Sequence, residues 1–255
     1  MSVRPKKRLG QHFLTDPEAV RQIVEAVAPP AGRRVVEIGP GEGALTGSLL
    51  ARFPGLVALE VDPDAIAHLR RRFPALDVRE QDVLAADWRA LAGDAGGLHV
   101  VGNLPYYITS PILFALLDAR AAVARAVVMV QKEVADRLVA PPGSKTYGTL
   151  SVYFSLYARA ELLLDVPRQA FRPPPKVESA VVALDFESAE PPEVPFAALQ
   201  RVVRTAFGQR RKMLRNSLGP LAEAAGADLG RFATLRPEAV APDDFVTLAR
   251  LIAVD

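Results

Sequence analysis

The chain has 255 residues, of which 50% are hydrophobic and 24% charged, and this composition is typical of a globular protein that can bury a full core. It contains no cysteine, which excludes disulfides and thiolate metal sites, and no stretch approaches the roughly 20 apolar residues of a membrane span. Acidic residues follow the basic N-terminus where a signal peptide would be apolar, so we expect a cytoplasmic protein.

The net charge of +2 is unevenly distributed. No acidic residue lies between Glu193 and Glu223, and this segment contains six basic residues: Arg201, Arg204, Arg210, Arg211, Lys212 and Arg215. The segment therefore carries +6, which leaves −4 on the rest of the chain. This distribution indicates a polyanionic partner, with a solvated helix face as the alternative.

The N-terminal arm is also basic, through Arg4, Lys6, Lys7 and Arg8. A polar and aromatic run, residues 10–15, follows it. Such an arm either contacts phosphates or closes over a ligand, unless it is a solvated tail. A helix is then predicted up to Val27, capped by Thr15 or Asp16 and stopped by two prolines.

An alternation of strands and helices fills the next hundred residues. Apolar runs predict strands over residues 34–38, 56–60, 77–80, 98–102 and 126–130. Helical spacing predicts helices over residues 45–50, 63–72, 110–117 and 132–139. The pattern indicates a parallel α/β sheet of Rossmann-like type, which binds ligands at the carboxyl ends of its strands.

Polar features follow each of the first three strands. A turn containing Gly39 and Gly41 lets the backbone approach a ligand at a helix N-terminus. Glu60, which lies 17 positions after Gly43, can accept hydrogen bonds from both hydroxyls of a ribose. Asp82 can accept from an adenine amino group, or it can cap the following turn. A structural turn remains the alternative for the glycines.

The fourth strand runs into Asn103-Leu104-Pro105-Tyr106. The Asn103 oxygen and a backbone carbonyl could accept the two N–H groups of an exocyclic amine while Tyr106 stacks on the base. Asparagine and proline also favour ordinary turns. A dinucleotide enzyme would use the glycine turn and Glu60 only, whereas a methyl donor held against a base-binding loop would use all four strand ends.

The C-terminal half is predicted to change from mixed to helical structure. A helix over residues 149–158 and strands over 161–166 and 177–186 flank a proline-rich loop that includes Phe171 and Lys176. The polar segment 188–195 indicates a domain boundary, so the predicted domains are 1–187 and 188–255. Further helices are expected over residues 196–206, 209–218, 221–225, 229–233 and 243–252.

Six motifs, in this order, closely resemble the dimethyladenosine transferase (KsgA/RsmA) family of ribosomal RNA adenine dimethyltransferases, and the resemblance covers nearly the whole chain. The motifs are Gly10–Leu14, Glu37–Gly43, Glu60–Asp62, Asn103–Ile108, Phe171–Ser179 and Phe207–Leu218. The resemblance implies a class I S-adenosylmethionine-dependent methyltransferase sheet with a small helical C-terminal domain.

The resemblance also implies which residues act. S-adenosylmethionine would be bound by His12, Leu14, Gly39, Glu60, Asp82 and Asn103, with Gly41 in the same glycine turn. The catalytic group would be Asn103, Leu104, Pro105 and Tyr106, with Phe171 stacking on the base opposite Tyr106. Phosphates would be gripped by Arg4, Lys6, Lys7, Arg8, Lys176, Arg210, Arg211, Lys212 and Arg215.

The implied reaction is N6,N6-dimethylation of two adjacent adenosines in the loop of the 3′-terminal helix of 16S rRNA, within the small ribosomal subunit or its precursor. It would need no metal and no membrane, and we expect a monomer acting in ribosome biogenesis. Two alternatives stay open: a 23S rRNA adenine methyltransferase of the macrolide-resistance type and a non-catalytic assembly factor. A NAD-dependent dehydrogenase is a more distant third.

Overall fold

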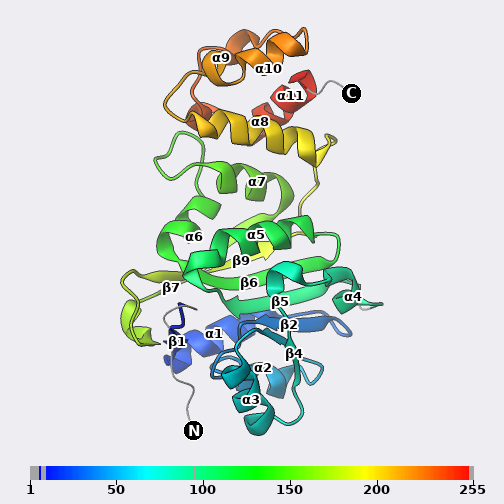
Figure 1. Cartoon of the computed structure of the whole chain (residues 1–255), viewed down its shortest axis with the longest axis vertical. Helices are drawn as coiled ribbons and strands as arrows, with labels where there is room; N and C mark the ends of the chain where they lie inside the picture. The colour runs from blue at the N-terminus through cyan, green and yellow to red at the C-terminus, as the bar shows by residue number, and fades with distance from the viewer. Residues whose placement is uncertain (1–5, 7–9, 95, 253–255) are drawn as a thin grey trace. The chain divides into compact units, whose positions relative to one another are not determined.

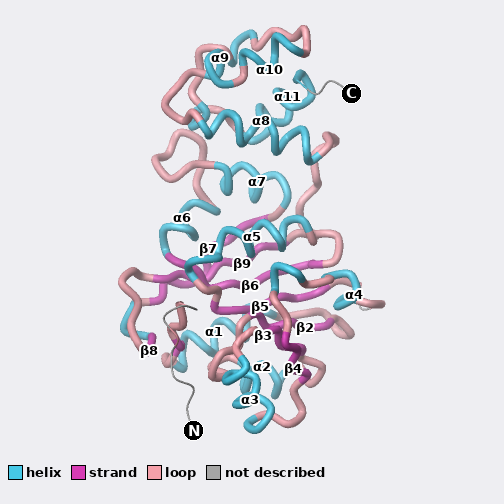
Figure 2. Tube along the Cα trace, viewed as in Figure 1, coloured by secondary structure: helices cyan, strands magenta, loops and turns pink. Residues whose placement is uncertain are grey.

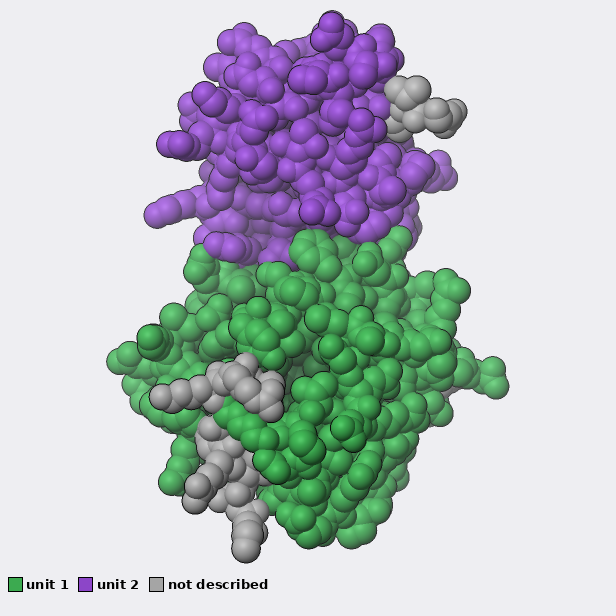
Figure 3. All heavy atoms as spheres, viewed as in Figure 1, with its two compact units in different colours: residues 1–135, 161–187 green, residues 136–160, 188–255 purple. Residues whose placement is uncertain are grey.

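A computed structural model describes residues 6, 10–94 and 96–252 of the chain. The chain forms two compact units (Figure 3). The first comprises residues 1–135 and 161–187, and the second comprises residues 136–160 and 188–255. The predicted division into 1–187 and 188–255 differs from this arrangement because residues 136–160 belong to the second unit.

The first unit is built on a seven-stranded sheet with the order β4-β3-β2-β5-β6-β9-β7. Five strands run parallel: β2 (Arg34–Ile38), β3 (Val57–Glu60), β4 (Asp77–Glu80), β5 (Leu98–Asn103) and β6 (Val123–Gln131). The remaining strands are β9 (Ser179–Asp185), antiparallel to β6, and β7 (Arg159–Val166). The predicted Rossmann-like α/β sheet is confirmed.

Helices cover both faces of this sheet (Figure 1). One face packs against α1 (Pro17–Val27), α2 (Thr46–Arg52) and α3 (Pro63–Arg72), and the other packs against α5 (Thr109–Asp118). The helix α6 (Lys132–Leu138) follows β6 directly. Asp16 caps α1 and Asp62 caps α3, each followed by a proline in the first turn, as is typical of helix starts.

Three short elements of the first unit carry too little periodicity to be predicted. The helix α4 (Trp88–Ala92) forms where no element was expected, and it buries Trp88. The strands β1 (Phe13–Leu14) and β8 (Phe171–Arg172) pair antiparallel, with Leu14 opposite Phe171. This small sheet holds the segment after the N-terminal arm against the proline-rich loop.

The second unit consists of helices and loops, apart from the first two residues of β7 (Figure 2). Its helices are α7 (Thr149–Tyr157), α8 (Phe196–Gly208), α9 (Leu214–Ser217), α10 (Gly219–Ala224) and α11 (Pro242–Ile252). Tyr153 and Tyr157 of α7 contact Phe196 at ring-centroid distances of 5.8 and 5.3 Å. Because these large aromatic side chains are buried against α8, residues 136–160 pack with the C-terminal helices.

Two helix predictions in this unit are wrong. Residues 209–213 form a turn, in which the Lys212 N–H donates to the Gln209 carbonyl, and only Leu214–Ser217 is helical within the predicted 209–218. The predicted helix over 229–233 is a single 3₁₀ turn, Gly230–Phe232. Within the described ranges, no helix is long and apolar enough to cross a membrane.

Candidate cofactor and base-binding site

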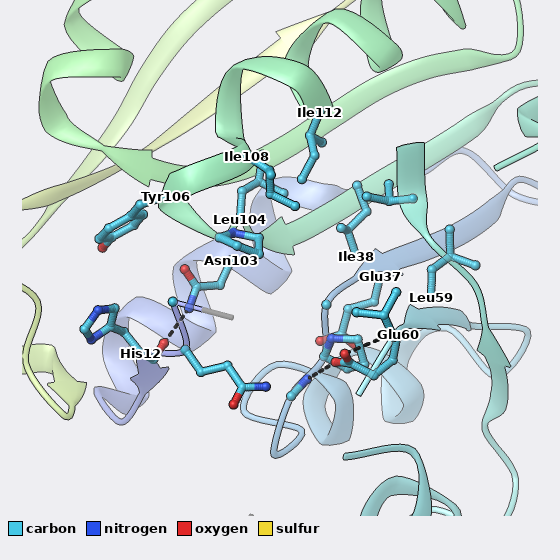
Figure 4. A pocket seen from close by; sticks show the side chains of 18 of the residues that line it. His12, Glu37, Ile38, Leu59, Glu60, Asn103, Leu104, Tyr106, Ile108 and Ile112 are labelled. Atoms are coloured by element: carbon cyan, nitrogen blue, oxygen red, sulfur yellow. Dashed lines mark hydrogen bonds between the residues drawn. The ribbon is translucent and has the colours of Figure 1, made fainter. Parts of the chain in front are cut away.

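A pocket lies at the carboxyl ends of the parallel strands of the first unit (Figure 4). Four strand ends contribute to its wall through Gly39, Glu60, Asp82 and Asn103. A fifth part of the wall is the segment Gly10–Leu14, which includes both His12 and Leu14. The structure thus brings together all the residues predicted to hold the cofactor: His12, Leu14, Gly39, Gly41, Glu60, Asp82 and Asn103.

The glycine turn after β2 has a backbone that only glycine adopts readily. Gly39 and Gly41 have φ values of 60° and 58°, in the left-handed region. A Cβ on Gly41 would lie 2.9 Å from Cε1 of Phe13, so the Phe13 ring packs directly on this turn. The glycines therefore permit close packing between the turn and the N-terminal segment, as well as close approach to a ligand.

Glu60 joins the end of β3 to the glycine turn. Its carboxylate accepts a hydrogen bond from the Gly41 N–H at 3.1 Å (Figure 4). It also accepts hydrogen bonds from the Val61 and Asp62 N–H groups at 2.9 Å each. The side chain is buried but lines the pocket. Backbone donors fix both oxygens at the pocket wall, where a carboxylate can receive hydroxyl donors from a ribose.

Glu37 is a second buried acid in the pocket wall, and we did not predict it as a site residue. Burial, together with the nearby charge of Glu60, raises the pKa of Glu37 to about 8. The hydrogen bond from the Thr46 hydroxyl, at 2.7 Å, partly opposes this rise. The sequence did contain a signal for Glu37, which is an acid inside the apolar strand Arg34–Ile38. Burying an acid costs free energy, so an acid in such a strand is a candidate site residue.

The charge of the pocket distinguishes between possible ligands. Glu60 and Asp82 line it together with Glu37, whose raised pKa of about 8 keeps it largely protonated at neutral pH, and none of the described lining residues is a lysine or an arginine. A sulfonium cation with an α-ammonium group fits such a wall, whereas the pyrophosphate of a dinucleotide does not. Asp82 also accepts a hydrogen bond from the Leu84 N–H at 2.9 Å, so the structure shows the turn-capping role considered above.

The side chain of Asn103 is oriented by the N-terminal segment. Its amide nitrogen donates to the His12 carbonyl at 2.9 Å (Figure 4). Because the nitrogen is used in this contact, the amide oxygen is the atom that remains for an incoming donor. Leu104 is buried, and its N–H donates to the Met129 carbonyl at 3.0 Å, which anchors the loop to β6.

Tyr106 is held at its hydroxyl and faces another ring. The hydroxyl lies 2.5 Å from Ser179 Oγ at the start of β9. The His12 ring stacks on Tyr106 with centroids 5.8 Å apart and planes inclined by 24°. His12 Nδ1 lies 2.8 Å from the Pro173 carbonyl oxygen. Ser179, which we did not predict, therefore fixes the orientation of the predicted stacking ring.

Phe171 does not lie where the resemblance placed it. Its side chain is 4% exposed, it belongs to the hydrophobic core with Leu14, and it does not line the pocket. The pairing of β1 with β8 fixes this position. Phe171 therefore lies in the core beside Leu14, and the ring that stacks beside Tyr106 in this structure is that of His12.

The predicted phosphate-binding residues fall into three groups. Arg4, Lys7 and Arg8 lie outside the described residues. Lys176, Arg211, Lys212 and Arg215 are exposed to solvent. Lys6 and Arg210 have partners within the chain: Lys6 pairs with Asp62 and Asp64, while Arg210 contacts Glu238 at 3.4 Å and donates to the Lys145 carbonyl at 2.7 Å.

Comparison with known proteins identifies the family that carries this site. The model of the family described as ribosomal RNA adenine dimethylase matches residues 3–239 of the chain. The chain belongs to this family. It is an S-adenosylmethionine-dependent rRNA adenine methyltransferase with the class I methyltransferase fold, as predicted.

Individual relatives agree with this assignment. The protein named ribosomal RNA small subunit methyltransferase A of Salinibacter ruber is 50% identical over 253 residues, which cover 97% of this chain and 84% of the relative. A dimethyladenosine transferase from Plasmodium falciparum superposes with a TM-score of 0.76 at 25% identity, over 93% of this chain and 96% of the other. The 23S rRNA methyltransferase ErmE superposes with a TM-score of 0.65 at 27% identity, over 94% and 99%.

Proposed function

We propose that this adenine dimethyltransferase acts on the small ribosomal subunit or its precursor. Its targets are N6 of two adjacent adenosines in the loop of the 3′-terminal helix of 16S rRNA. Sequence identity supports this target. The chain is 50% identical, over 97% of its length, to a protein named ribosomal RNA small subunit methyltransferase A, but only 27% identical to the 23S rRNA methyltransferase ErmE. The reaction takes place in the cytoplasm during ribosome biogenesis and is carried out by a monomer without a metal.

The residues around the pocket fit S-adenosylmethionine. The bound cofactor supplies an electrophilic methyl group on a sulfonium sulfur. Glu60 would accept the ribose hydroxyls, Asp82 would accept from the adenine amino group, and the acidic wall would balance the positive charge. His12, Leu14, Gly39 and Gly41 close the wall around it.

Asn103 is the central residue of the proposed mechanism. The lone pair of an adenine N6 is delocalised into the ring, so this nitrogen is a weak nucleophile. If Asn103 Oδ1 and the Leu104 carbonyl accept its two hydrogens, N6 moves toward tetrahedral geometry and its lone pair faces the methyl carbon. The observation that supports this role is the hydrogen bond that the Asn103 side-chain nitrogen donates to the His12 carbonyl. This bond leaves the side-chain oxygen to accept from N6.

The reaction balances without a strong base. The N6 lone pair would form the new N–C bond, the sulfur would keep the electron pair of the broken C–S bond, and the surplus proton on nitrogen would pass to water. The second transfer would repeat these bond changes on the monomethylated nitrogen, whose single remaining hydrogen needs only one of the two acceptors. Pro105 stiffens the loop, and Tyr106 stacks on the extruded base, a contact worth about 1 to 3 kcal/mol.

Phosphates of the RNA would be held by exposed basic residues. These are Lys176 in the first unit and Arg211, Lys212 and Arg215 in the second, together with Arg4, Lys7 and Arg8. Such contacts make binding depend on salt, because each neutralised phosphate releases counterions. Lys6 and Arg210 are not part of this proposal, since both pair within the chain.

The test replaces the only two asparagines of the chain, Asn103 and Asn216. Asn103→Ala should lower kcat on unmethylated small subunits by about 10² to 10³, the usual loss when one stabilising hydrogen-bond partner is removed. Asn216→Ala, an exposed matched control, should retain the wild-type rate. Transfer of labelled methyl groups is the measurement, and wild-type turnover by Asn103→Ala would refute the mechanism.

A further inference from the structure

The segment Gly10–Leu14, here called the strap, runs along the pocket and is attached at several points. Phe13 packs on Gly41, and the His12 carbonyl accepts from Asn103. Two further contacts secure the C-terminal end of the strap. β1 pairs with β8, and the Thr15 N–H donates a hydrogen bond to the Ala170 carbonyl at 2.7 Å. The strap therefore contributes to the pocket wall only while it stays in this position.

The N-terminal end of the strap is secured by a separate cluster. Lys6 Nζ lies 2.5 Å from Asp62 Oδ1 and 2.6 Å from Asp64 Oδ2. Gln11, a strap residue, donates from Nε2 to Asp62 Oδ2 at 3.2 Å and accepts the Lys6 N–H at 2.8 Å. The cluster thus joins Lys6, the strap and the start of α3.

Asp62 is the buried centre of this cluster. Its side chain is inaccessible to solvent, and it also caps α3 through the Asp64 N–H at 3.1 Å. Burial disfavours its ionised form, yet hydrogen bonds from Lys6, Gln11 and the Asp64 N–H outweigh burial and lower its pKa. Asp62 follows the ribose-binding candidate Glu60 by two positions, and its own N–H donates to Glu60 Oε1 at 2.9 Å.

We propose that Lys6 is a positioning residue for the cofactor, because its ion pair with Asp62 holds the strap against the pocket. Lys6 acts through the strap and touches neither the methyl group nor the base. The inference rests on the use of S-adenosylmethionine and is independent of which rRNA is methylated. It replaces the prediction that Lys6 grips a phosphate.

The physical reason is a coupled equilibrium. A ligand that contacts the strap binds fully only to molecules with the strap in place, so its apparent affinity falls with the fraction of such molecules. An ion pair between two exposed groups would change this fraction little. Here the acidic partner is buried, so removing Lys6 leaves a buried carboxylate without its cation and favours displacement of the strap.

The test compares variants of the full chain at Lys6, at Gln11 and at an exposed control lysine. Lys6→Met removes the ion pair, Lys6→Arg keeps a cation at this position, and Lys145→Met removes a matched lysine that is exposed and has no proposed role in binding. The probe is S-adenosylhomocysteine, with its dissociation constant measured by titration calorimetry and its release rate by stopped flow. Affinity for unmethylated small subunits is measured separately.

Lys6→Met should raise the dissociation constant and the release rate of S-adenosylhomocysteine by about fivefold. It should also raise KM for S-adenosylmethionine more than it lowers kcat. Lys6→Arg should restore most of the affinity, and Lys145→Met should bind the probe like the wild type. Gln11→Glu, which places a second negative charge beside Asp62, should weaken probe binding in the same direction.

Unchanged probe binding by both Lys6→Met and Gln11→Glu would overturn the proposal. A loss of affinity for small subunits with unchanged probe binding would also overturn it, and would identify Lys6 as a phosphate contact. Because probe binding is measured in the absence of RNA, these outcomes do not depend on the target proposed above. An enzyme that methylates another RNA would still show the effect of Lys6.

Discussion

Glu37 offers the sharpest test of the electrostatics of the pocket. It is fully buried in the first strand of the sheet, accepts one hydrogen bond from Thr46 and faces the charge of Glu60. The change Glu37→Gln keeps the shape of the side chain and an oxygen for Thr46, but it removes the titrating proton. Any difference in the pH dependence of stability between the two proteins therefore reports on Glu37.

The size and sign of the effect follow from the pKa. The native pKa of about 8 lies above the ordinary value of 4.5, so the native state binds more protons than the unfolded state between these values. The free energy of unfolding must therefore fall as the pH rises from about 4.5 to about 8. At about 1.4 kcal/mol for each tenfold change in proton affinity, the loss has an upper limit of about 5 kcal/mol.

Urea unfolding between pH 5 and pH 9 measures this effect. Glu37→Gln should match the wild type near pH 5 and exceed its stability by several kcal/mol, up to about 5, above pH 8. Glu80→Gln, which alters an exposed glutamate at the end of β4, is the control and should follow the wild type at every pH. Parallel curves for Glu37→Gln and the wild type would refute the burial argument.

The same substitution should have the opposite effect on cofactor binding. An ionised Glu37 attracts the positive charge of S-adenosylmethionine, whereas glutamine does not. Binding to the wild type should therefore tighten as the pH rises toward 8, and Glu37→Gln should bind about tenfold more weakly at pH 8 and lose this pH dependence. Equal affinities at pH 8 would show that Glu37 serves folding alone.

Five further substitutions, at four positions, test individual residues. Arg210→Ala should lower the free energy of unfolding by about 1 kcal/mol, because it removes the hydrogen bond to the Lys145 carbonyl. Arg211→Ala should leave the free energy of unfolding unchanged and weaken RNA binding at low salt. Tyr106→Ala should reduce methylation by about 10- to 100-fold, while Tyr106→Phe, which loses only the Ser179 contact, should retain most of it. Phe171→Leu should lower the unfolding midpoint in urea with kcat retained, because Phe171 is a core residue here, and loss of kcat at unchanged stability would restore the stacking role.

Much of the sheet and the pocket could be predicted from the sequence. The spacing of apolar residues and the polar residues at strand ends are both signals that a short stretch of sequence contains. Each apolar run that ends in a polar residue marks a parallel strand whose carboxyl end meets the others at one edge. Glu60, Asp82 and Asn103 were found in this way, and all three line the pocket. The helix over 149–157 also follows its apolar spacing despite β-favouring residues.

The features that were missed depend on contacts between distant parts of the chain. Phe171 reads as an exposed aromatic in a proline-rich loop, and only its pairing with Leu14 shows that it is buried. Lys6 reads as part of a basic arm, although its charge is neutralised by Asp62. Arg210 likewise has Glu238 as its partner. A sequence read locally shows the charge of a residue but not the partner that folding provides.

The turn at residues 209–213 was missed for a different reason. Its basic residues are good helix formers, so propensity favours a helix through the segment. Gly208 and Gln209 instead end α8, and α9 starts only at Leu214. As a result, Arg211 and Lys212 lie in an exposed turn and not on a helical face.

We infer that the pocket methylates adenine N6 in small-subunit RNA. The most direct test incubates the wild-type protein with labelled S-adenosylmethionine and either unmethylated small subunits or large subunits, and then maps the label on the RNA. We predict four methyl groups, two on N6 of each of two adjacent adenosines in the loop of the 3′-terminal helix of 16S rRNA, with the large subunit unlabelled. Label on 23S rRNA, or on a different atom or site of 16S rRNA, would contradict this claim.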